Sequence, residues 1–143
     1  MAAPEPKLDA AGVNALLRRA FPLGADTDQV ALVVDLGPGR VEVVRPYSSV
    51  MLRPGQLISG PNLMAVADTA AYALVLAHIG DELMAVTSQL TINFLRGALP
   101  GDIHAEAELL RLGRRNAVCD VRIWTESPER LAAQATVTYA IPQ

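Results

Sequence analysis

The sequence predicts an α+β fold in which an antiparallel β-sheet wraps around one long central helix. The first observation is the segment of residues 61–79, which is apolar on almost every face, as a core helix is. The second is a series of later segments in which apolar and polar residues alternate, as in strands with one buried face. Two shorter β-branched segments come before the helix. The expected order is therefore helix, two strands, long helix and four strands.

The N-terminal part is expected to form one amphipathic helix over residues 10–21. Asp9 is placed to cap its first turn, and Pro22 and Gly24 are placed to end it. Residues 1–7 contain two prolines and no apolar pattern, so we expect them to be flexible. The apolar positions of the helix recur at helical spacing: Val13, Leu16, Leu17 and Ala20.

Two short β-branched segments follow, at residues 29–36 and 41–44. The Gly-Pro-Gly sequence of residues 37–39 separates them and favours a tight turn, so the pair is expected to form a hairpin. Residues 45–60 contain several prolines and glycines and are expected to form a long connection.

The central helix is expected to begin at Pro61, which suits a first helical turn, and to stop at Gly80. Asp68 is its only carboxylate. Polar residues interrupt its apolar run, so we expect a helix buried in the core and not a membrane span. Its apolar residues are Leu63, Met64, Val66, Ala70, Leu74, Val75 and Leu76.

The C-terminal half is expected to form an antiparallel meander. Gly-containing turns at residues 100–102 and 113–116 separate alternating segments. In one of them Ala105, Ala107 and Leu109 share a face. The expected strands cover residues 83–95, 103–112, 117–125 and 131–141.

Length and composition narrow the class of protein. A chain of 143 residues suits one domain over its whole length. Half of the residues (51%) are apolar, which favours a homo-oligomer, a dimer or a tetramer, with apolar surface hidden between subunits. The net charge of −3 argues against a nucleic-acid partner. The N-terminus lacks the pattern of a signal peptide, so a cytoplasmic location is expected.

Cysteine and histidine offer little for catalysis or metal binding. The single cysteine, Cys119, lies in an alternating segment and is interpreted as a small core residue. His78 and His104 lie far apart in the sequence and match no ligand spacing. We therefore expect no metal and no resident cofactor.

Several strings between about Gly55 and Tyr139 resemble the hotdog superfamily, and within it the PaaI-type acyl-CoA thioesterases. They are Ala67-Asp68-Thr69-Ala70, Leu90 to Ala98 followed by Gly101-Asp102, and Leu112 to Ala117. The chain departs from the family in two places. Ser59-Gly60-Pro61 stands where His-Gly-Gly is usual, and Arg53 stands near a position that usually carries Asn or Gln.

The resemblance implies hydrolysis of an acyl-CoA thioester to a free acid and CoA, with CoA as part of the substrate. It implies that Asp68 acts as general base on water or as nucleophile, and the residues alone do not separate these roles. The structural alternative is a buried aspartate bonded to the backbone or to a neighbouring hydroxyl such as Thr69.

An exposed amide at the start of the helix can polarise the carbonyl. Gly60 is the first candidate and Asn62 the second, since Pro61 has no N–H. Gly60 and Asp68 are eight residues apart, roughly 12 Å along a helix at 1.5 Å per residue. They cannot both reach one carbonyl. If both act, each site is expected to combine Gly60 of one subunit with Asp68 of its partner.

Other candidate residues have both a functional and a structural interpretation. By the resemblance, Thr87 orients the water; otherwise it is a strand threonine, and a slip in register would bring in Ser88. Ser59 either binds the thioester or caps the helix, and capping is favoured. Tyr72 either lines an acyl pocket or packs in the core. Three arginines are candidates for the CoA phosphates or for solvated turns: Arg96, Arg114 and Arg115.

Two other functions stay open at this stage. The loss of His-Gly-Gly would fit a hotdog protein that binds acyl-CoA without hydrolysing it. A hotdog dehydratase needs a histidine paired with a carboxylate, and neither His78 nor His104 matches that arrangement. The acyl group itself is not specified by the sequence.

Overall fold

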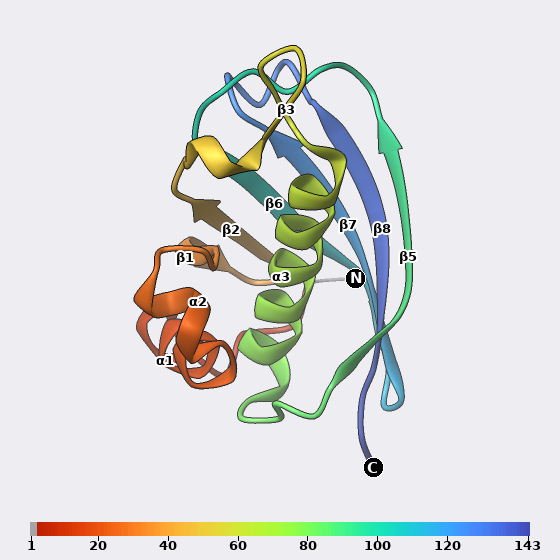
Figure 1. Cartoon of the computed structure of the whole chain (residues 1–143). Helices are drawn as coiled ribbons and strands as arrows, with labels where there is room; N and C mark the ends of the chain where they lie inside the picture. The colour runs from red at the N-terminus through yellow and green to blue at the C-terminus, as the bar shows by residue number, and fades with distance from the viewer. Residues whose placement is uncertain (1–2) are drawn as a thin grey trace.

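The computed structural model describes residues 3–143, and Figure 1 shows their arrangement. A curved sheet surrounds one long helix, and two shorter helices lie beside that helix. The elements in chain order are α1 (Ala10–Ala20), α2 (Pro22–Asp26), β1 (Leu32–Gly37), β2 (Arg40–Arg45), a 3₁₀ turn (Ser49–Met51), β3 (Leu52–Arg53), β4 (Leu57–Ile58), α3 (Gly60–Ile79), β5 (Val86–Phe94), β6 (Ile103–Leu112), β7 (Asn116–Trp124) and β8 (Ala133–Ala140).

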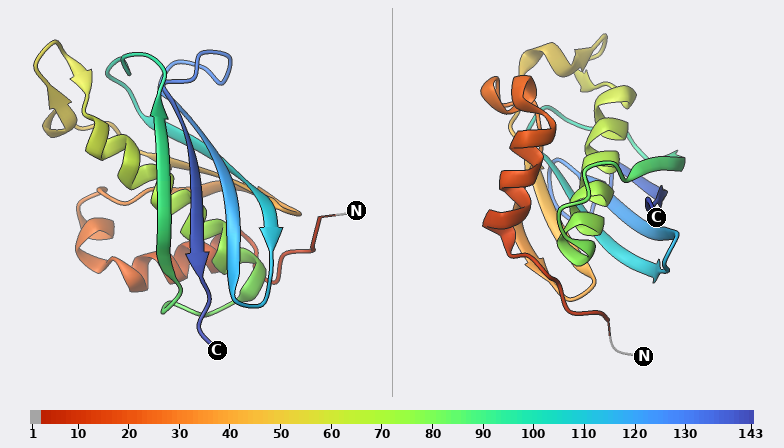
Figure 2. Two further views of the ribbon diagram at one scale, coloured as in Figure 1. Left: turned by 90° about the vertical axis from the view of Figure 1, so that its right-hand side faces the viewer. Right: turned by 90° about the horizontal axis from the view of Figure 1, so that it is seen from below.

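The main sheet is antiparallel and has the strand order β1-β2-β6-β7-β8-β5. Its two edges are therefore β1 and β5. Figure 2 shows the strands of the C-terminal half lying side by side, with α3 behind them. This arrangement confirms the predicted α+β fold with a sheet wrapped around a central helix.

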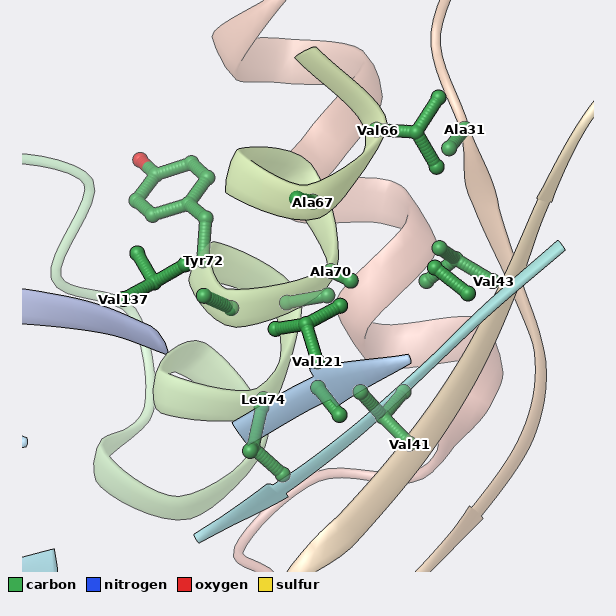
Figure 3. Packing of buried hydrophobic residues seen from close by; sticks show 14 of the residues in the cluster. Ala31, Val41, Val43, Val66, Ala67, Ala70, Tyr72, Leu74, Val121 and Val137 are labelled. Carbon is green, nitrogen blue, oxygen red and sulfur yellow. The ribbon is translucent and has the colours of Figure 1, made fainter. Parts of the chain in front are cut away.

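The centre of the fold is α3, because its side chains are apolar in nearly every direction. Every residue from Ala70 to His78 is buried. Figure 3 shows Ala67, Ala70 and Leu74 of α3 facing valines of the strands, among them Val41 and Val121. By length and composition α3 would pass as a membrane span, but 67% of the qualifying window is buried inside the structure, as in a core helix.

Small residues on the inner face of the sheet let α3 approach closely. Most inward positions of β6, β7 and β8 follow the predicted alternation and are buried. Leu109, predicted to share this face, is only partly buried and lies where the register of β6 with β7 shifts. Cys119 is one of them, which confirms its interpretation as a core residue, and its burial raises the pKa of the thiol to about 12. The small inward residues are Ala105, Ala107, Ala117, Cys119, Ala133 and Ala135.

His78 ties the end of α3 to the β1–β2 hairpin. Its Nε2 accepts a hydrogen bond from the Gly39 amide at 3.0 Å, and its Nδ1 lies 2.8 Å from the Leu74 carbonyl oxygen. With Nε2 accepting, Nδ1 carries the proton and donates to Leu74. The chain before α1 also contacts this end, since Lys7 N donates to the Ala77 carbonyl at 2.8 Å.

Several predicted boundaries need correction. The first helix ends at Ala20, just before Pro22 as predicted, but Pro22 also begins a second short helix, α2, since a proline at the first helical position lacks only an N–H that would be unpaired anyway. The strand expected from residue 83 begins at Val86, after a turn closed by a hydrogen bond from Ala85 N to Glu82 O.

Two further predictions about connections also change. The hairpin strand expected from residue 29 begins at Leu32. The connection over residues 45–60 contains the 3₁₀ turn and the short β3–β4 ribbon. The flexibility predicted for residues 1–7 concerns in part residues 1 and 2, which lie outside the described residues.

Candidate active site

Asp68 lies half-buried on α3 and receives two hydrogen bonds on one carboxylate oxygen. Thr87 Oγ1 donates to Asp68 Oδ1 at 2.5 Å, and Tyr139 Oη donates to the same oxygen at 2.8 Å. Within residues 3–143 no donor reaches Oδ2. The carboxylate is thus fixed through one oxygen, while the other is free to take a proton or to attack a carbon.

The sheet places both donors opposite Asp68. Thr87 of β5 and Tyr139 of β8 are direct cross-strand partners. The register of this pair shifts between Thr87 and Gln89, so Ser88 lies at a bulge, and its hydroxyl donates to the Thr138 carbonyl. Thr87, and not Ser88, is therefore the hydroxyl of this strand that contacts Asp68, and its role in orienting a water stays a prediction.

Tyr139 is the residue of this cluster that sequence reasoning missed. Burial raises the pKa of its phenol, and the negative charge of Asp68 raises it further, so the hydroxyl stays protonated and acts as a donor. Its signal in the sequence was the alternation of β8, which puts Ala133, Ala135, Val137 and Tyr139 on the inner face. Its contact with Asp68, however, depends on the tertiary packing of β8 against α3.

An aromatic row leads away from the carboxylate. The Tyr72 ring stacks on Tyr139 with centroids 5.5 Å apart, and Phe21 meets the Tyr72 ring edge-on at 5.9 Å. These rings line an open cavity of about 500 Å³, together with Thr87. Figure 3 shows Tyr72 projecting from α3 on the side of Val137. The other residues of the cavity wall are Arg19, Ala20, Leu83, Ala85 and Val86.

The first turn of α3, at the N-terminal end of the helix, has one backbone amide without a hydrogen-bond partner in residues 3–143. Among the described residues the Gly60 amide has no hydrogen-bond partner, whereas the Asn62 amide donates to the Ser59 carbonyl at 3.1 Å. Asn62 therefore does not offer the second amide considered above. A Cβ on Gly60 would lie 3.2 Å from the ring of Phe94, so this end of the helix also packs tightly against β5.

Ser59 occupies the N-cap position but does not cap the helix with its side chain. Its hydroxyl instead accepts a hydrogen bond from Asn62 Nδ2 at 2.7 Å, and Asn62 Oδ1 accepts one from Arg45 Nη1 at 3.1 Å. The favoured prediction of a capping hydroxyl is thus wrong, because the Asn62 side chain competes for the serine oxygen. Arg45 was missed because an arginine at the start of a long connection resembles a surface residue.

The candidate arginines lie apart from this carboxylate cluster. Arg96 is exposed and donates to the Leu131 carbonyl at 3.2 Å. Arg114 and Arg115 lie at the β6–β7 turn, where with Arg111 they line an open cavity of about 570 Å³. Arg53 is exposed on β3 and donates to the adjacent Pro54 carbonyl.

The remaining polar candidates do not join the cluster. Thr69 donates to the Ala65 carbonyl at 3.0 Å and not to Asp68. The hydroxyl groups that the structural alternative expected on Asp68 are present, but they come from Thr87 and Tyr139. His104 stacks on Trp124 with ring centroids 5.6 Å apart. In the described part of the chain no group of three or more His, Cys, Asp or Glu side chains is arranged to hold a metal ion.

Comparison with known proteins identifies the family. A model of the thioesterase superfamily matches residues 55–132, more than half of the chain.

The chain belongs to the thioesterase superfamily.

This thioesterase is 31% identical over 102 residues to the acyl-coenzyme A thioesterase PaaI of Escherichia coli K12, with 70% of each chain covered. Among solved structures, it is similar to a candidate thioesterase from Silicibacter sp. TM1040, at 36% identity and a TM-score of 0.87, with 97% of this chain and 95% of the other covered. The E. coli PaaI structure has the same fold at 23% identity and a TM-score of 0.72, covering 92% and 96% of the two chains. The predicted hotdog fold and PaaI-type resemblance are confirmed, and the protein is a thioester hydrolase.

Proposed function

We propose that this thioesterase hydrolyses an acyl-CoA to a free acid and CoA, with Asp68 as the acid/base or nucleophilic group. One observation carries the proposal. Two donors, Thr87 and Tyr139, hold Oδ1 of Asp68 beside an aromatic cavity and leave Oδ2 available. A carboxylate held in this way needs no reorganisation before it acts, which lowers the barrier.

The same arrangement serves two chemical routes. As a base, Oδ2 takes a proton from water while the water oxygen attacks the thioester carbon. As a nucleophile, Oδ2 attacks that carbon itself and forms a mixed anhydride that water then opens. In both routes the carbonyl oxygen becomes an oxyanion, which the Gly60 amide stabilises as a hydrogen-bond donor.

Gly60 reaches this carbonyl from a second copy of the chain. On α3 it lies eight residues from Asp68, roughly 12 Å away at 1.5 Å per residue, too far to share one carbonyl. Its first-turn position lies against Phe94 at the end of β5, whereas Asp68 bonds Thr87 at the beginning of the same strand. Antiparallel pairing of β5 with its copy therefore brings the two groups together, twice per dimer.

The free edge of β5 supports this assembly. β5 is the last strand of the sheet, so one side has no strand partner among the described residues. Unpaired edge strands with apolar side chains are templates for pairing with another chain. The exposed apolar residues on and beside this edge are Met84, Val86, Phe94 and Leu95.

We assign the acyl group to the aromatic cavity and the phosphates of CoA to the β6–β7 turn. The cavity walls carry Phe21, Tyr72 and Tyr139, which suit an apolar acyl chain or ring. The turn offers Arg111, Arg114 and Arg115, and guanidinium groups suit phosphate. The related E. coli protein is named an acyl-coenzyme A thioesterase, which agrees with this substrate class.

Release of free thiol from a panel of aryl-, short- and medium-chain acyl-CoAs tests the proposal. We expect turnover of at least one class and a loss of about 10³-fold or more in Asp68→Asn, with unchanged circular dichroism. Thr138→Val, a change of a neighbouring side chain on β8, serves as the matched control. Binding of acyl-CoA without any turnover by the wild-type protein would contradict hydrolysis.

A further inference from the structure

Arg45 is a buried cation with no anionic partner. It is the last residue of β2 and is only 8% exposed. None of the ion pairs among residues 3–143 includes it. Its Nε is the one buried side-chain nitrogen or oxygen of the described residues that lacks a hydrogen-bond partner.

Such a charge destabilises a fold unless something compensates for it. Moving a guanidinium out of water is costly unless its charge is paired, and an uncharged side chain of similar size often does as well or better for stability. Desolvation lowers the pKa of Arg45, yet arginine stays charged in proteins. Packing alone therefore does not explain an arginine at this position.

The hydrogen bonds of Arg45 connect it to the start of α3, where the Gly60 amide is the proposed oxyanion donor. Arg45 Nη1 donates to Asn62 Oδ1, and Asn62 Nδ2 donates to Ser59 Oγ. Ser59 immediately precedes Gly60, whose amide is free. Because the serine oxygen accepts from Asn62, its hydroxyl proton is left to donate to another acceptor.

We propose that Arg45, acting through Asn62, makes Ser59 a second donor beside the Gly60 amide, and that its uncompensated charge stabilises the oxyanion of the thioester. The inference rests on the proposed function. Pro61 removes a backbone N–H from this helix start, and the serine hydroxyl takes its place. When the carbonyl is attacked, its π electrons move to oxygen, and the new negative charge meets Ser59 O–H and Gly60 N–H. The Arg45 guanidinium lies behind them, one residue removed through Asn62. Arg45 is thus a positioning residue.

Kinetics separate this role from a structural one. Removal of an oxyanion donor lowers kcat by about 10² to 10³-fold. We expect that loss in Ser59→Ala, a loss of at least about 10-fold in Arg45→Met, and KM within roughly twofold for both. The two losses should not add in the double variant, because both act through one chain of hydrogen bonds. Arg40→Met, also on β2, removes surface ion pairs to Asp35 and Glu106 and should leave kcat unchanged.

Stability gives an independent measurement. An apolar replacement of an unpaired buried charge is expected to leave the melting temperature of Arg45→Met unchanged or higher. A lower melting temperature together with an unchanged kcat would assign Arg45 to the fold alone and overturn the inference. If Arg45→Met does not fold, Ser59→Ala still tests the inference, because a wild-type kcat in that variant would overturn it.

A spectroscopic experiment distinguishes failure of this inference from failure of the proposed function. The infrared carbonyl band of a ¹³C-labelled acyl-CoA bound to Asp68→Asn should lie at lower frequency than in Asp68→Asn/Arg45→Met. An identical band in both proteins would overturn the inference, whether or not the wild-type protein turns substrate over. A shifted band in a protein without turnover would support the inference and reject hydrolysis. Failure to bind any acyl-CoA would overturn both.

Discussion

At the scale of single residues, two hydroxyl groups hold one oxygen of Asp68 and leave the other free, and we expect the free oxygen to act in the reaction. Tyr139 and Thr87 both donate to Oδ1. Each hydrogen bond restricts rotation of the carboxylate. We therefore expect the two bonds to affect the orientation of Asp68 more than the stability of the fold. A group that orients a catalytic carboxylate is expected to change kcat with little change in KM.

Tyr139→Phe tests this orientation directly. The ring and its stacking on Tyr72 are retained, while both hydrogen bonds to Asp68 are lost. We expect kcat to fall by about 10 to 100-fold and the free energy of unfolding to fall by only about 1 kcal/mol. Steady-state kinetics and urea unfolding measure the two effects. A wild-type kcat in Tyr139→Phe would show that Thr87 alone holds the carboxylate.

Cys119 makes stability depend on alkaline pH. Its folded-state pKa is raised from 9.0 to about 12, so the folded protein holds the thiol proton where the unfolded chain releases it. The stabilising effect is complete below about pH 9 and is lost as pH rises toward 12, with a slope near 1.4 kcal/mol per pH unit. Cys119→Ala should show a shallower decline over this window in urea unfolding at each pH. Parallel slopes for the two proteins would contradict this linkage.

At the scale of elements, the start of α3 is fitted against the end of β5. A methyl group on Gly60 would lie 3.2 Å from Phe94 Cζ, so the exposed phenylalanine ring must move by a few tenths of an ångström. Gly60→Ala is expected to lower kcat by about 10-fold or more, because the amide and its surroundings shift relative to the carbonyl.

The second-site variant Phe94→Ala provides the control for this prediction. Removing the ring gives the new methyl group room, so part of the lost kcat should return in Gly60→Ala/Phe94→Ala. Stability should change by less than about 1 kcal/mol in Gly60→Ala, since alanine is a good helix former. If the double variant were slower than Gly60→Ala, steric displacement would not explain the loss.

The sequence predicted whole elements better than their contacts. The apolar run of α3 and the alternation of β6 to β8 are local patterns, and they located the helix and the strands. The bulge at Ser88 and the helix that begins at Pro22 were not predicted, because the local sequence at each point is compatible with more than one backbone conformation. Arg45 follows Val41 and Val43 at a spacing of two, so its inward direction was present in the pattern, although its charge argued against it.

At the scale of the whole molecule, each proposed site needs two chains. Asp68 and Gly60 come from different subunits in the proposed dimer, so a variant impaired at one residue should complement a variant impaired at the other. Mixing Asp68→Asn with Gly60→Ala after unfolding and refolding should give mixed dimers, each with one intact site and one doubly substituted site.

The expected recovery follows from counting. Half of the refolded dimers are mixed, and one of their two sites is intact, so activity should reach about a quarter of the wild-type value. Thiol release measured before and after refolding provides the comparison, and each variant refolded alone is the control. No recovery in the mixture, with mixed dimers present by mass spectrometry, would place both groups in one subunit.

The two hydrogen bonds on a single oxygen of Asp68 also predict how many ¹⁸O atoms this carboxylate can incorporate. In water enriched in ¹⁸O, an anhydride opened at the aspartyl carbon leaves a heavy atom in the protein, whereas activated water delivers it only to the released acid. Because Oδ1 is anchored by Thr87 and Tyr139, we expect the carboxylate not to rotate between reaction cycles. Repeated turnovers should therefore enrich Asp68 by at most one heavy atom, and loosening the anchor with Tyr139→Phe should allow the second.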